Sequence, residues 1–394
     1  MRVLFVSPTP THPQNAGNRA RVYRLAAAVR QMGHDVHFAF IRRERGDERA
    51  MRDWWGDRFH AIDYTEPTAR NGPQRLAGQL LGRWLPGLEH NLPIDAWFDT
   101  SNLAALRQIQ EAHRFEVVIV EYVFMSLAFS AFGSDVLKIV DTHDVFTDRY
   151  KIFLQSGRKP DWFSASRDEE AAGLRRADAV IAIQDQEREF FERISGVRTA
   201  TIGHLVDTQG LYDDPEVRGD CPQAPTMLFV GSGNPVNVDS VRQFIDNTLP
   251  LIKRRVPDIE FLLAGRICNA FRPQPGIRHL GELDDLAAAY RAATLVVAPM
   301  RFGTGLNIKV IEALGHGMPL VTTSNGVKGI SMQAAPFLVA DTGPDFAAEV
   351  EKLVADSRLR STLSANAQQF AVAWNRDFLQ ALQQLVQPLA SRPT

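Results

Sequence analysis

Residues 294–323 read TLVVAPMRFGTGLNIKVIEALGHGMPLVTT. A short apolar run, a glycine-containing turn, a stretch with helical spacing and a second apolar run follow one another, which predicts a strand, turn, helix and strand. Gly315, Gly317 and Pro319 are expected to end the helix and to let the next strand pass close to it. Strands joined by a helix run parallel, so this stretch predicts a parallel sheet.

The same alternation extends through the rest of the chain. The expected strands are runs rich in Val, Ile, Leu and Phe, at 3–7, 34–41, 115–121, 136–143, 178–184, 226–231, 259–265, 294–299 and 320–323. The expected helices cover 19–31, 240–254 and 286–292, one begins near Leu306, and the chain from 344 onward is helical by pattern. A Pro-, Gly- and Asp-rich passage at 213–226 is typical of a linker. The sequence therefore predicts an α/β protein with two doubly wound parallel sheets in series.

Length and composition agree with two globular domains. The 394 residues exceed one ordinary core, since domains commonly have about 100–200 residues. A net charge of −2 provides no basic field for nucleic acid, so no nucleic-acid partner is expected. Only two cysteines occur, Cys221 and Cys268, and neither a signal-peptide core nor an apolar run of about 20 residues is visible. We expect a cytoplasmic protein, with peripheral contact at the inner face of the cell membrane left open.

Residues that follow the strands are the first candidates for a site, because parallel sheets bind ligands at the carboxyl ends of their strands. After the first strand, Gly17 precedes an expected helix with Asn18 as a candidate cap. Backbone N–H groups at such a helix start can face an anion. A lone glycine before a helix is more often only a turn, so this signal is weak by itself.

The turn before the helix of the opening stretch predicts a stronger anion site. Arg301, Gly303, Gly305 and Lys309 place two cations and a flexible turn around a helix N-terminus, an arrangement that suits a diphosphate. Glu312 lies on the same helical face as Lys309, and its carboxylate would suit a ribose diol. The alternative is a solvated Lys–Glu pair, which stabilises a helix by only about 0.3–0.5 kcal/mol.

These residues carry a resemblance to a known family. The stretch from Val297 to Thr323 resembles the donor-binding signature of family-four (GT4-type) retaining glycosyltransferases of the GT-B fold, in the bacterial subgroup with a Gly-x-Gly-x3-Lys-x2-Glu-Ala core. The likeness extends in the expected order along most of the chain, to the loop around Gly17, DTHDVFTDR at 141–149, ADAVIAIQDQE at 177–187, LVD at 205–207, LFVGSGNPVNVDS at 228–240 and LLAGR at 262–266. Residues 42–114 match least clearly.

The resemblance implies two Rossmann-like domains facing across a cleft. It places an acceptor-binding domain at 1–205, a donor-binding domain at 206–372 and a helix at 373–394 that returns to the first domain. The implied activity is transfer of a hexosyl-type sugar from a nucleotide-diphosphate donor to a saccharide, lipid-linked or other hydroxyl acceptor, with retention of anomeric configuration. A UDP-sugar is the favoured donor and a GDP-sugar the next, in bacterial cell-surface polysaccharide or glycolipid synthesis. No cofactor or metal is expected if basic residues neutralise the diphosphate.

Carried over by position, the resemblance also assigns residues. It gives His143, Lys309 and Glu312 catalytic roles: His143 beside the donor sugar, Lys309 with Arg301 on the diphosphate, and Glu312 on the ribose hydroxyls. Backbone near Gly281 to Leu286, which includes Leu283, would meet the base. The other donor-binding residues lie in loops after strands or at helix starts and are Gly17, Asn18, Gly231, Ser232, Arg266, Gly303, Thr304, Gly305, Leu306 and Asn307.

Three positions depart from the family pattern. Thr304 stands where members with a Glu-x7-Glu signature carry the first glutamate, which removes a presumed contact to the donor sugar and leaves its identity open. Ser232 and Asn237 stand where many members carry an arginine and a lysine. Lys309 and Arg301 are expected to replace that charge. Arg266 is a further candidate, and an ordinary surface residue at a strand end is the equal alternative for it.

Several other hypotheses remain open from the sequence. Asp141, His143 and Asp144 are metal-ligand types, but one short cluster is weak evidence and no metal site is predicted. A non-transferring enzyme such as a UDP-N-acetylglucosamine 2-epimerase, or a nucleotide-binding module without turnover, has the same architecture. The segment QRLAGQLLGRWLP predicts an apolar, partly basic acceptor face within residues 70–100.

Overall fold

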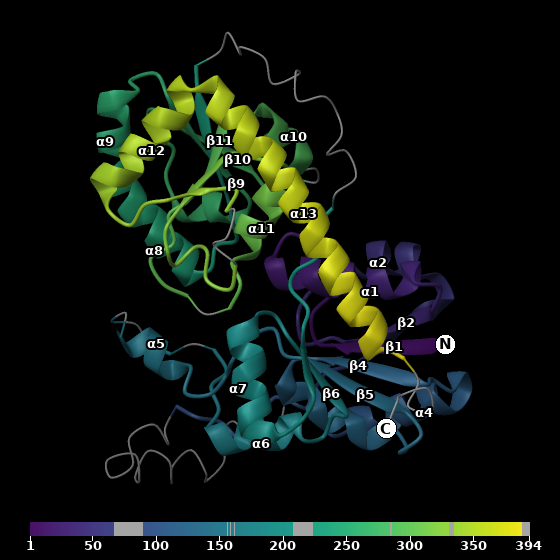
Figure 1. The fold of residues 1–394 in the computed structure, drawn as a ribbon. Helices are drawn as coiled ribbons and strands as arrows, with labels where there is room; N and C mark the ends of the chain where they lie inside the picture. Colours follow the sequence, from purple (N-terminus) through teal and green to yellow (C-terminus); the bar gives the residue numbers. More distant parts are fainter. Residues whose placement is uncertain are drawn as a thin grey trace. The chain divides into compact units, whose positions relative to one another are not determined.

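The computed structural model describes residues 1–66, 90–155, 157, 159–160, 162–207, 224–283, 286–303, 305–330 and 335–387. They form two compact units (Figure 1). Unit 1 comprises Met1–Gln14, Asn18–Gly203 and Phe378–Thr394, and unit 2 comprises Asn15–Gly17 and His204–Asp377. Most of the predicted linker and most of the predicted acceptor face lie outside the described residues. The functional domain limits 1–205, 206–372 and 373–394 stay predictions.

Unit 1 contains a seven-stranded, fully parallel sheet. Its strands lie in the order β3-β2-β1-β4-β5-β6-β7. They are β1 (Arg2–Ser7), β2 (Asp35–Ile41), β3 (Phe59–Ile62), β4 (Val117–Glu121), β5 (Leu137–Asp141), β6 (Ala179–Ala182) and β7 (Thr199–Thr201). Its helices are α1 (Gly17–Gln31), α2 (Glu48–Trp55), α4 (Asn102–His113), α5 (Tyr150–Gln155), α6 (Arg167–Leu174) and α7 (Asp185–Ser195), with short 3₁₀ helices η1 (Gly56–Arg58) and η3 (Val123–Ala131). Strands β4 and β6 are buried along their whole length, as expected for a parallel sheet covered on both faces.

Unit 2 contains a six-stranded parallel sheet in the order β10-β9-β8-β11-β12-β13. Its strands are β8 (Thr226–Val230), β9 (Glu260–Ala264), β10 (Ile277–Gly281), β11 (Leu295–Ala298), β12 (Leu320–Thr322) and β13 (Leu338–Val339). Its helices are α8 (Pro235–Gln243), α9 (Leu249–Arg255), α10 (Leu286–Ala292), α11 (Ile308–Gly315), α12 (Gly343–Ala355) and part of α13 (Ser357–Leu385), with η5 (Phe244–Thr248) and η6 (Arg266–Ala270). The predicted α/β class with two doubly wound parallel sheets is confirmed.

The strand order of each sheet contains one point where the winding direction reverses. In unit 1 the reversal lies between β1 and β4, and in unit 2 it lies between β8 and β11. Open parallel sheets bind ligands in the crevice outside the carboxyl ends of the two strands at such a point. The loops after β1, β4, β8 and β11 are therefore the places where a site is expected.

Three helices differ from their predicted limits. Helix α1 begins at Gly17, so Asn18 lies inside its first turn and is not its cap. The helix expected over 240–254 consists of α8, the π-helical turn η5 and α9. Pro250 lacks the N–H that a continuous α-helix would require there, which accounts for the widened turn before it. Helix α11 begins at Ile308, two residues after the predicted start.

Candidate functional site

The predicted donor-binding residues of unit 2 gather at the carboxyl edge of its sheet. Gly231 and Ser232 follow β8, Arg266 follows β9, Leu283 follows β10 and Arg301 follows β11. Thr304 lies outside the described residues. Because β8 and β11 flank the reversal point, Ser232 and Arg301 border the crevice in which this fold class binds ligands.

Glycines bring the backbone together at this edge. Gly265, with φ of 93°, would place a β-carbon 2.5 Å from the carbonyl oxygen of Gly231, so no larger residue fits without a shift. The Gly265 N–H donates to the Gly281 carbonyl at 2.7 Å, and the Ile267 N–H donates to the Gly231 carbonyl at 3.1 Å. The ends of β8, β9 and β10 are thus held close to one another, and the backbone lies at the surface of the edge without intervening side chains.

Lys309 and Glu312 lie on α11 as the sequence predicts. Lys309 is the second residue of the helix, and its Nζ lies 5.8 Å from the centre of the Phe229 ring on β8. The first turn of α11 therefore lies beside the end of β8. Burial lowers the pKa of the Lys309 amine to about 8, and the Glu312 carboxylate partly opposes this effect. A desolvated cation at a positive helix end is a binding element for an anion.

The turn before α11 has the conformation that its glycines require. Gly303 and Gly305 have φ of 145° and 73°, which only glycine adopts readily. The Asn307 side chain makes no capping bond to the helix, and its Nδ2 donates instead to the Asn325 carbonyl at 3.0 Å. The N–H groups at the start of α11 are therefore not covered by the Asn307 side chain, and Leu306 beside it is buried.

Arg301 has a different environment from the one predicted. It is an exposed residue whose Nη1 lies 3.0 Å from Oδ2 of Asp239 on α8. Part of its charge is thus already neutralised, so a diphosphate would share Arg301 with a carboxylate. Arg266 is half-buried, and its Nε makes no hydrogen bond to the part of the chain that the structure describes. A buried guanidinium N–H at this edge favours the ligand-binding interpretation of Arg266 over the surface one.

A histidine that is not among the predicted site residues lies beside Glu312 within unit 2. His204 is fully buried, and its Nε2 lies 3.6 Å from Oε1 of Glu312. The His204 carbonyl accepts a 2.8 Å hydrogen bond from the Trp374 indole. The sequence predicts a loop or surface position for His204; it lies in the loop after β7, but it is fully buried. The His204 imidazole thus lies close to the Glu312 carboxylate.

In unit 1, the predicted residue His143 lies in a cluster at the ends of β4 and β5. Its Nε2 is 2.5 Å from Oε2 of Glu121, the last residue of β4, and 3.5 Å from Oδ2 of Asp141, the last residue of β5. The two carboxylates are neighbours because Glu121 and Asp141 are paired in the parallel register. The His143 ring also stacks on Tyr122, with centroids 4.0 Å apart.

The cluster is completed by helix α1. Arg21 is buried and pairs with both oxygens of Asp141, at 2.9 Å from Nε and 2.7 Å from Nη2. Asn18 donates to the Tyr122 hydroxyl at 3.1 Å. The predicted residues Asn18 and His143 are thus brought into one cluster by Tyr122, while the region around Gly17 supplies the helix start.

Burial and charge set the protonation of this cluster. Burial, reinforced by the Asp141 charge, raises the pKa of Glu121 well above its usual value. Burial lowers the pKa of His143 to about 4, so its imidazole is neutral at pH 7. The direction of the hydrogen bond between Glu121 and Nε2 of His143 depends on the tautomer: when Glu121 is protonated it donates to Nε2, and the ring keeps its proton on Nδ1. Tyr122 and His143 both have positive φ, 71° and 62°, a strained conformation that often marks functional positions.

The same cluster bears on the metal hypothesis. One ligand atom from each of Glu121, Asp141 and His143 lies within 4.8 Å of the others, so a carboxylate from a second strand, β4, joins the short cluster that the sequence offers. The Arg21 guanidinium, however, already pairs with both oxygens of Asp141. Asp144 is turned elsewhere and pairs with Arg149. The buried Arg21 guanidinium thus already balances the negative charge of Asp141, which a metal ion would otherwise neutralise.

Arg21, Glu121 and Tyr122 are residues of this cluster that the sequence does not predict. Arg21 looks like an ordinary polar position of an amphipathic helix, and its partner Asp141 is 120 residues away. Glu121 had a usable signal, because a charged residue directly after the buried run VVIV lies at the carboxyl edge of the sheet.

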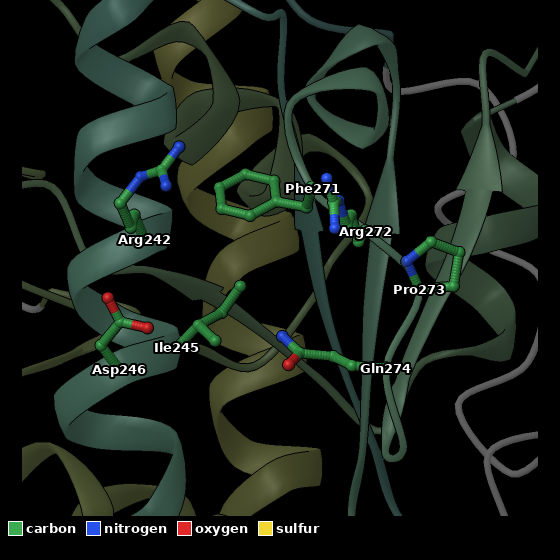
Figure 2. Close-up of a pocket in the computed structure, with 7 residues that line it drawn as sticks. All are labelled: Arg242, Ile245, Asp246, Phe271, Arg272, Pro273 and Gln274. Carbon is green, nitrogen blue, oxygen red and sulfur yellow. The ribbon is translucent and has the colours of Figure 1, made fainter.

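Unit 2 also has a pocket on another surface (Figure 2). The residues that line it come from α8, η5 and the segment before β10 and are Arg242, Ile245, Asp246, Phe271, Arg272, Pro273 and Gln274. None of the predicted donor-binding residues lines it. Among the residues that the structure describes, no helix is both long and apolar enough to span a membrane.

Comparison with known proteins agrees with this geometry. The model of the "Glycosyl transferase 4-like domain" family matches residues 16–202, and that of "Glycosyl transferases group 1" matches residues 224–356. The chain belongs to the GT4-type glycosyltransferases. These matches favour a GT4-type transferase over the epimerase alternative.

Two curated relatives carry the same description. "Phosphatidyl-myo-inositol mannosyltransferase" of Mycolicibacterium smegmatis is 27% identical over 201 residues, which cover 48% of this chain and 51% of the relative. The protein of that name from Mycobacterium leprae is 29% identical over 154 residues, covering 36% of this chain and 40% of the relative. The match thus spans about half the length of the curated relatives or less.

Solved structures show the same fold. Sucrose-phosphate synthase from Thermosynechococcus elongatus has a TM-score of 0.68 at 16% identity, with 98% of each chain covered. HepE from Anabaena, solved in complex with UDP and glucose, has a TM-score of 0.62 at 15% identity, with 97% of this chain and 99% of that chain covered. The predicted GT-B fold of this GT4-type glycosyltransferase is confirmed.

Proposed function

We propose that this chain transfers a hexosyl group from a nucleotide-diphosphate sugar to a hydroxyl acceptor, with retention of anomeric configuration. The observation that carries the proposal is the start of α11, where Lys309 and the glycine turn lie at the reversal point of the unit 2 sheet. Family membership supports glycosyl transfer as the reaction.

The donor is proposed to be a UDP-sugar, with a GDP-sugar next. A structural neighbour, HepE, was solved with UDP, and this agrees with a uridine nucleotide. The acceptor is proposed to carry its hydroxyl on a saccharide or a lipid, because the curated relatives are named for phosphatidyl-myo-inositol. Cytoplasmic location with peripheral membrane contact, and a role in bacterial cell-surface glycan or glycolipid synthesis, belong to the same proposal.

The chemistry follows from the charge that the reaction develops. Breaking the bond between the sugar and the diphosphate places negative charge on the leaving phosphate, and a fixed cation and helix N–H groups stabilise it. One preorganised donor of this kind contributes about 3–4 kcal/mol to lowering a barrier. In this proposal Lys309 and the first turn of α11 hold the diphosphate, Glu312 binds the ribose, and His143 serves the donor sugar. No metal is required.

A thermal-shift titration tests the donor site directly. The purified protein is titrated with UDP, GDP, ADP and dTDP, with and without Mg²⁺. A ligand at 100 times its Kd adds about 2.7 kcal/mol of stability, which corresponds to roughly 5 °C or more for a domain of this size. We expect one nucleotide to stabilise the protein without dependence on Mg²⁺.

Three variants make the test specific. Lys309→Ala and Glu312→Ala should weaken binding about tenfold or more, as expected for loss of a charged contact. Lys328→Ala removes an exposed lysine of the same unit and should bind as the unaltered protein does. Equal binding by all four proteins would refute the donor site. Release of free nucleotide only when an acceptor is present, followed by NMR of the product anomer, tests transfer and retention.

A further inference from the structure

Three histidines meet in unit 1 at the edge of the sheet opposite to the candidate site. His37 is the third residue of β2, His60 is the second residue of β3, and His113 is the last residue of α4. One ring nitrogen from each lies within 4.8 Å of the other two. By contrast, Glu121 is the last residue of β4, and His143 lies two residues after the end of β5.

The register explains why the two strand histidines share a face. His60 is paired with Ala39, and His37 precedes Ala39 by two residues, so both histidines point to the same side of the sheet. The third histidine is presented by the end of α4, where the Arg2 guanidinium donates to the His113 carbonyl at 2.6 Å. The ring centroids are 4.7–5.3 Å apart.

The ring nitrogens face one another at a short distance. Nδ1 of His37 lies 3.0 Å from Nε2 of His60. Two nitrogens bound to one zinc ion at about 2.0–2.1 Å in tetrahedral geometry are roughly 3.3 Å apart, so only a small adjustment separates this pair from a chelating one.

A carboxylate supports the other side of His37. Its Nε2 lies 3.6 Å from Oδ2 of Asp35, and the other oxygen of Asp35 accepts a 2.6 Å hydrogen bond from Nε of Arg58. A carboxylate behind a histidine ligand is the usual outer-shell arrangement of histidine metal sites, because it fixes the ring and raises its basicity. Phe115 packs against the His37 ring at 5.0 Å and restricts the ring from the third side.

We propose that His37, His60 and His113 bind a divalent transition metal, with Zn²⁺ as the first candidate and water as the fourth ligand. Three imidazoles select zinc, copper or nickel and not magnesium or calcium, which prefer oxygen ligands. The ion ties the edge strand β3 and the end of α4 to β2. The site is structural and independent of glycosyl transfer.

The test uses tag-free full-length protein stripped with a chelator and dialysed. Zinc bound per chain is measured by elemental analysis after equilibration with Zn²⁺, and the melting temperature is measured with Zn²⁺, Ni²⁺ and Mg²⁺. We expect one zinc per chain and a rise in melting temperature with Zn²⁺ and Ni²⁺ but not with Mg²⁺. Cobalt substitution should give the visible absorption of a nitrogen-ligated four-coordinate site in the unaltered protein, which needs no variant.

Variants locate the ion. His60→Gln should lose the bound zinc, Asp35→Asn should weaken it about 10- to 100-fold, and His34→Ala, a nearby half-buried histidine outside the cluster, should retain it. Circular dichroism of each metal-free variant checks that it folds. The proposal is overturned if His60→Gln binds zinc as tightly as the unaltered protein does, or if the unaltered protein gives neither stoichiometric zinc nor the cobalt spectrum, in which case the histidines form a hydrogen-bonded cluster only.

Discussion

The contact between Glu121 and His143 determines which form of the imidazole the protein presents. If Glu121 is protonated at pH 7, as its burial indicates, a glutamine can replace it as a donor to Nε2. We predict that Glu121→Gln retains turnover within about threefold, whereas Glu121→Ala loses about tenfold or more because Nε2 is left unsatisfied. Steady-state kcat and KM, with the exposed Glu189→Ala as control, measure this. Equal loss in the Gln and Ala variants would show that Glu121 acts as an anion.

Lys309 makes donor binding depend on pH. Its pKa of about 8 means that the amine is mostly charged at pH 7 and mostly neutral at pH 9. Because the neutral form cannot pair with a phosphate, we predict that the Kd for the nucleotide rises up to about tenfold between pH 7 and pH 9. Calorimetric titration at several pH values measures it. Lys309→Arg, which stays charged, should flatten the profile, and an unchanged profile in that variant would assign the effect to another group.

Single residues also show what the sequence could predict about the site. The relation between Lys309 and Glu312 could be predicted because it is local: two residues three positions apart lie on the same face of a helix. Arg21 and Asp141 are buried partners 120 residues apart, and only the folded sheet brings them together. His204 was likewise hidden, since its neighbour Glu312 is far along the chain.

At the scale of elements, the ends of β9 and β10 allow a matched test of the close backbone approach. Gly265 and Gly281 both have positive φ, 93° and 72°, so alanine strains either position. Only at Gly265 would the added carbon meet a backbone atom, whereas nothing lies within 4 Å at Gly281. We predict that Gly265→Ala lowers the free energy of unfolding by about 1–3 kcal/mol more than Gly281→Ala does. Urea unfolding measures both, and equal losses would contradict the proposed backbone contact.

The elements themselves were largely predictable, and their exceptions have local causes. Runs of Val, Ile and Leu mark buried parallel strands, and the helix at 286–292 has the limits that its pattern predicts. The π-turn before α9 and the later start of α11 depend on the detailed geometry around Pro250, Gly303 and Gly305. Such residues interrupt the periodic pattern of the sequence, so they predict the end of an element but not the conformation of the turn.

At the scale of the whole molecule, helix α13 belongs to both units. Residues from Phe378 onward group with unit 1, and Leu382 is fully buried there. We predict that Leu382→Ala lowers the free energy of unfolding by about 2–5 kcal/mol, as for other fully buried leucines, while Gln383→Ala on the exposed face changes it by less than about 0.5 kcal/mol. Chemical unfolding and calorimetry measure the loss in each variant. Similar losses in Leu382→Ala and Gln383→Ala would mean that this segment adds little to the stability of unit 1.

Unit 1 is built from segments that the ribosome makes at different times, because most of unit 2 lies between them in the sequence. Met1–Gln14 and Asn18–Gly203 of unit 1 leave the ribosome early, but Leu382, Leu385 and Val386 emerge only after the 174 residues of His204–Asp377. At about 5–20 residues per second the nascent unit 1 waits roughly 10–35 s with part of its core missing. During translation, the sheet that carries His143 therefore lacks these three buried side chains until the segment after Asp377 has been made.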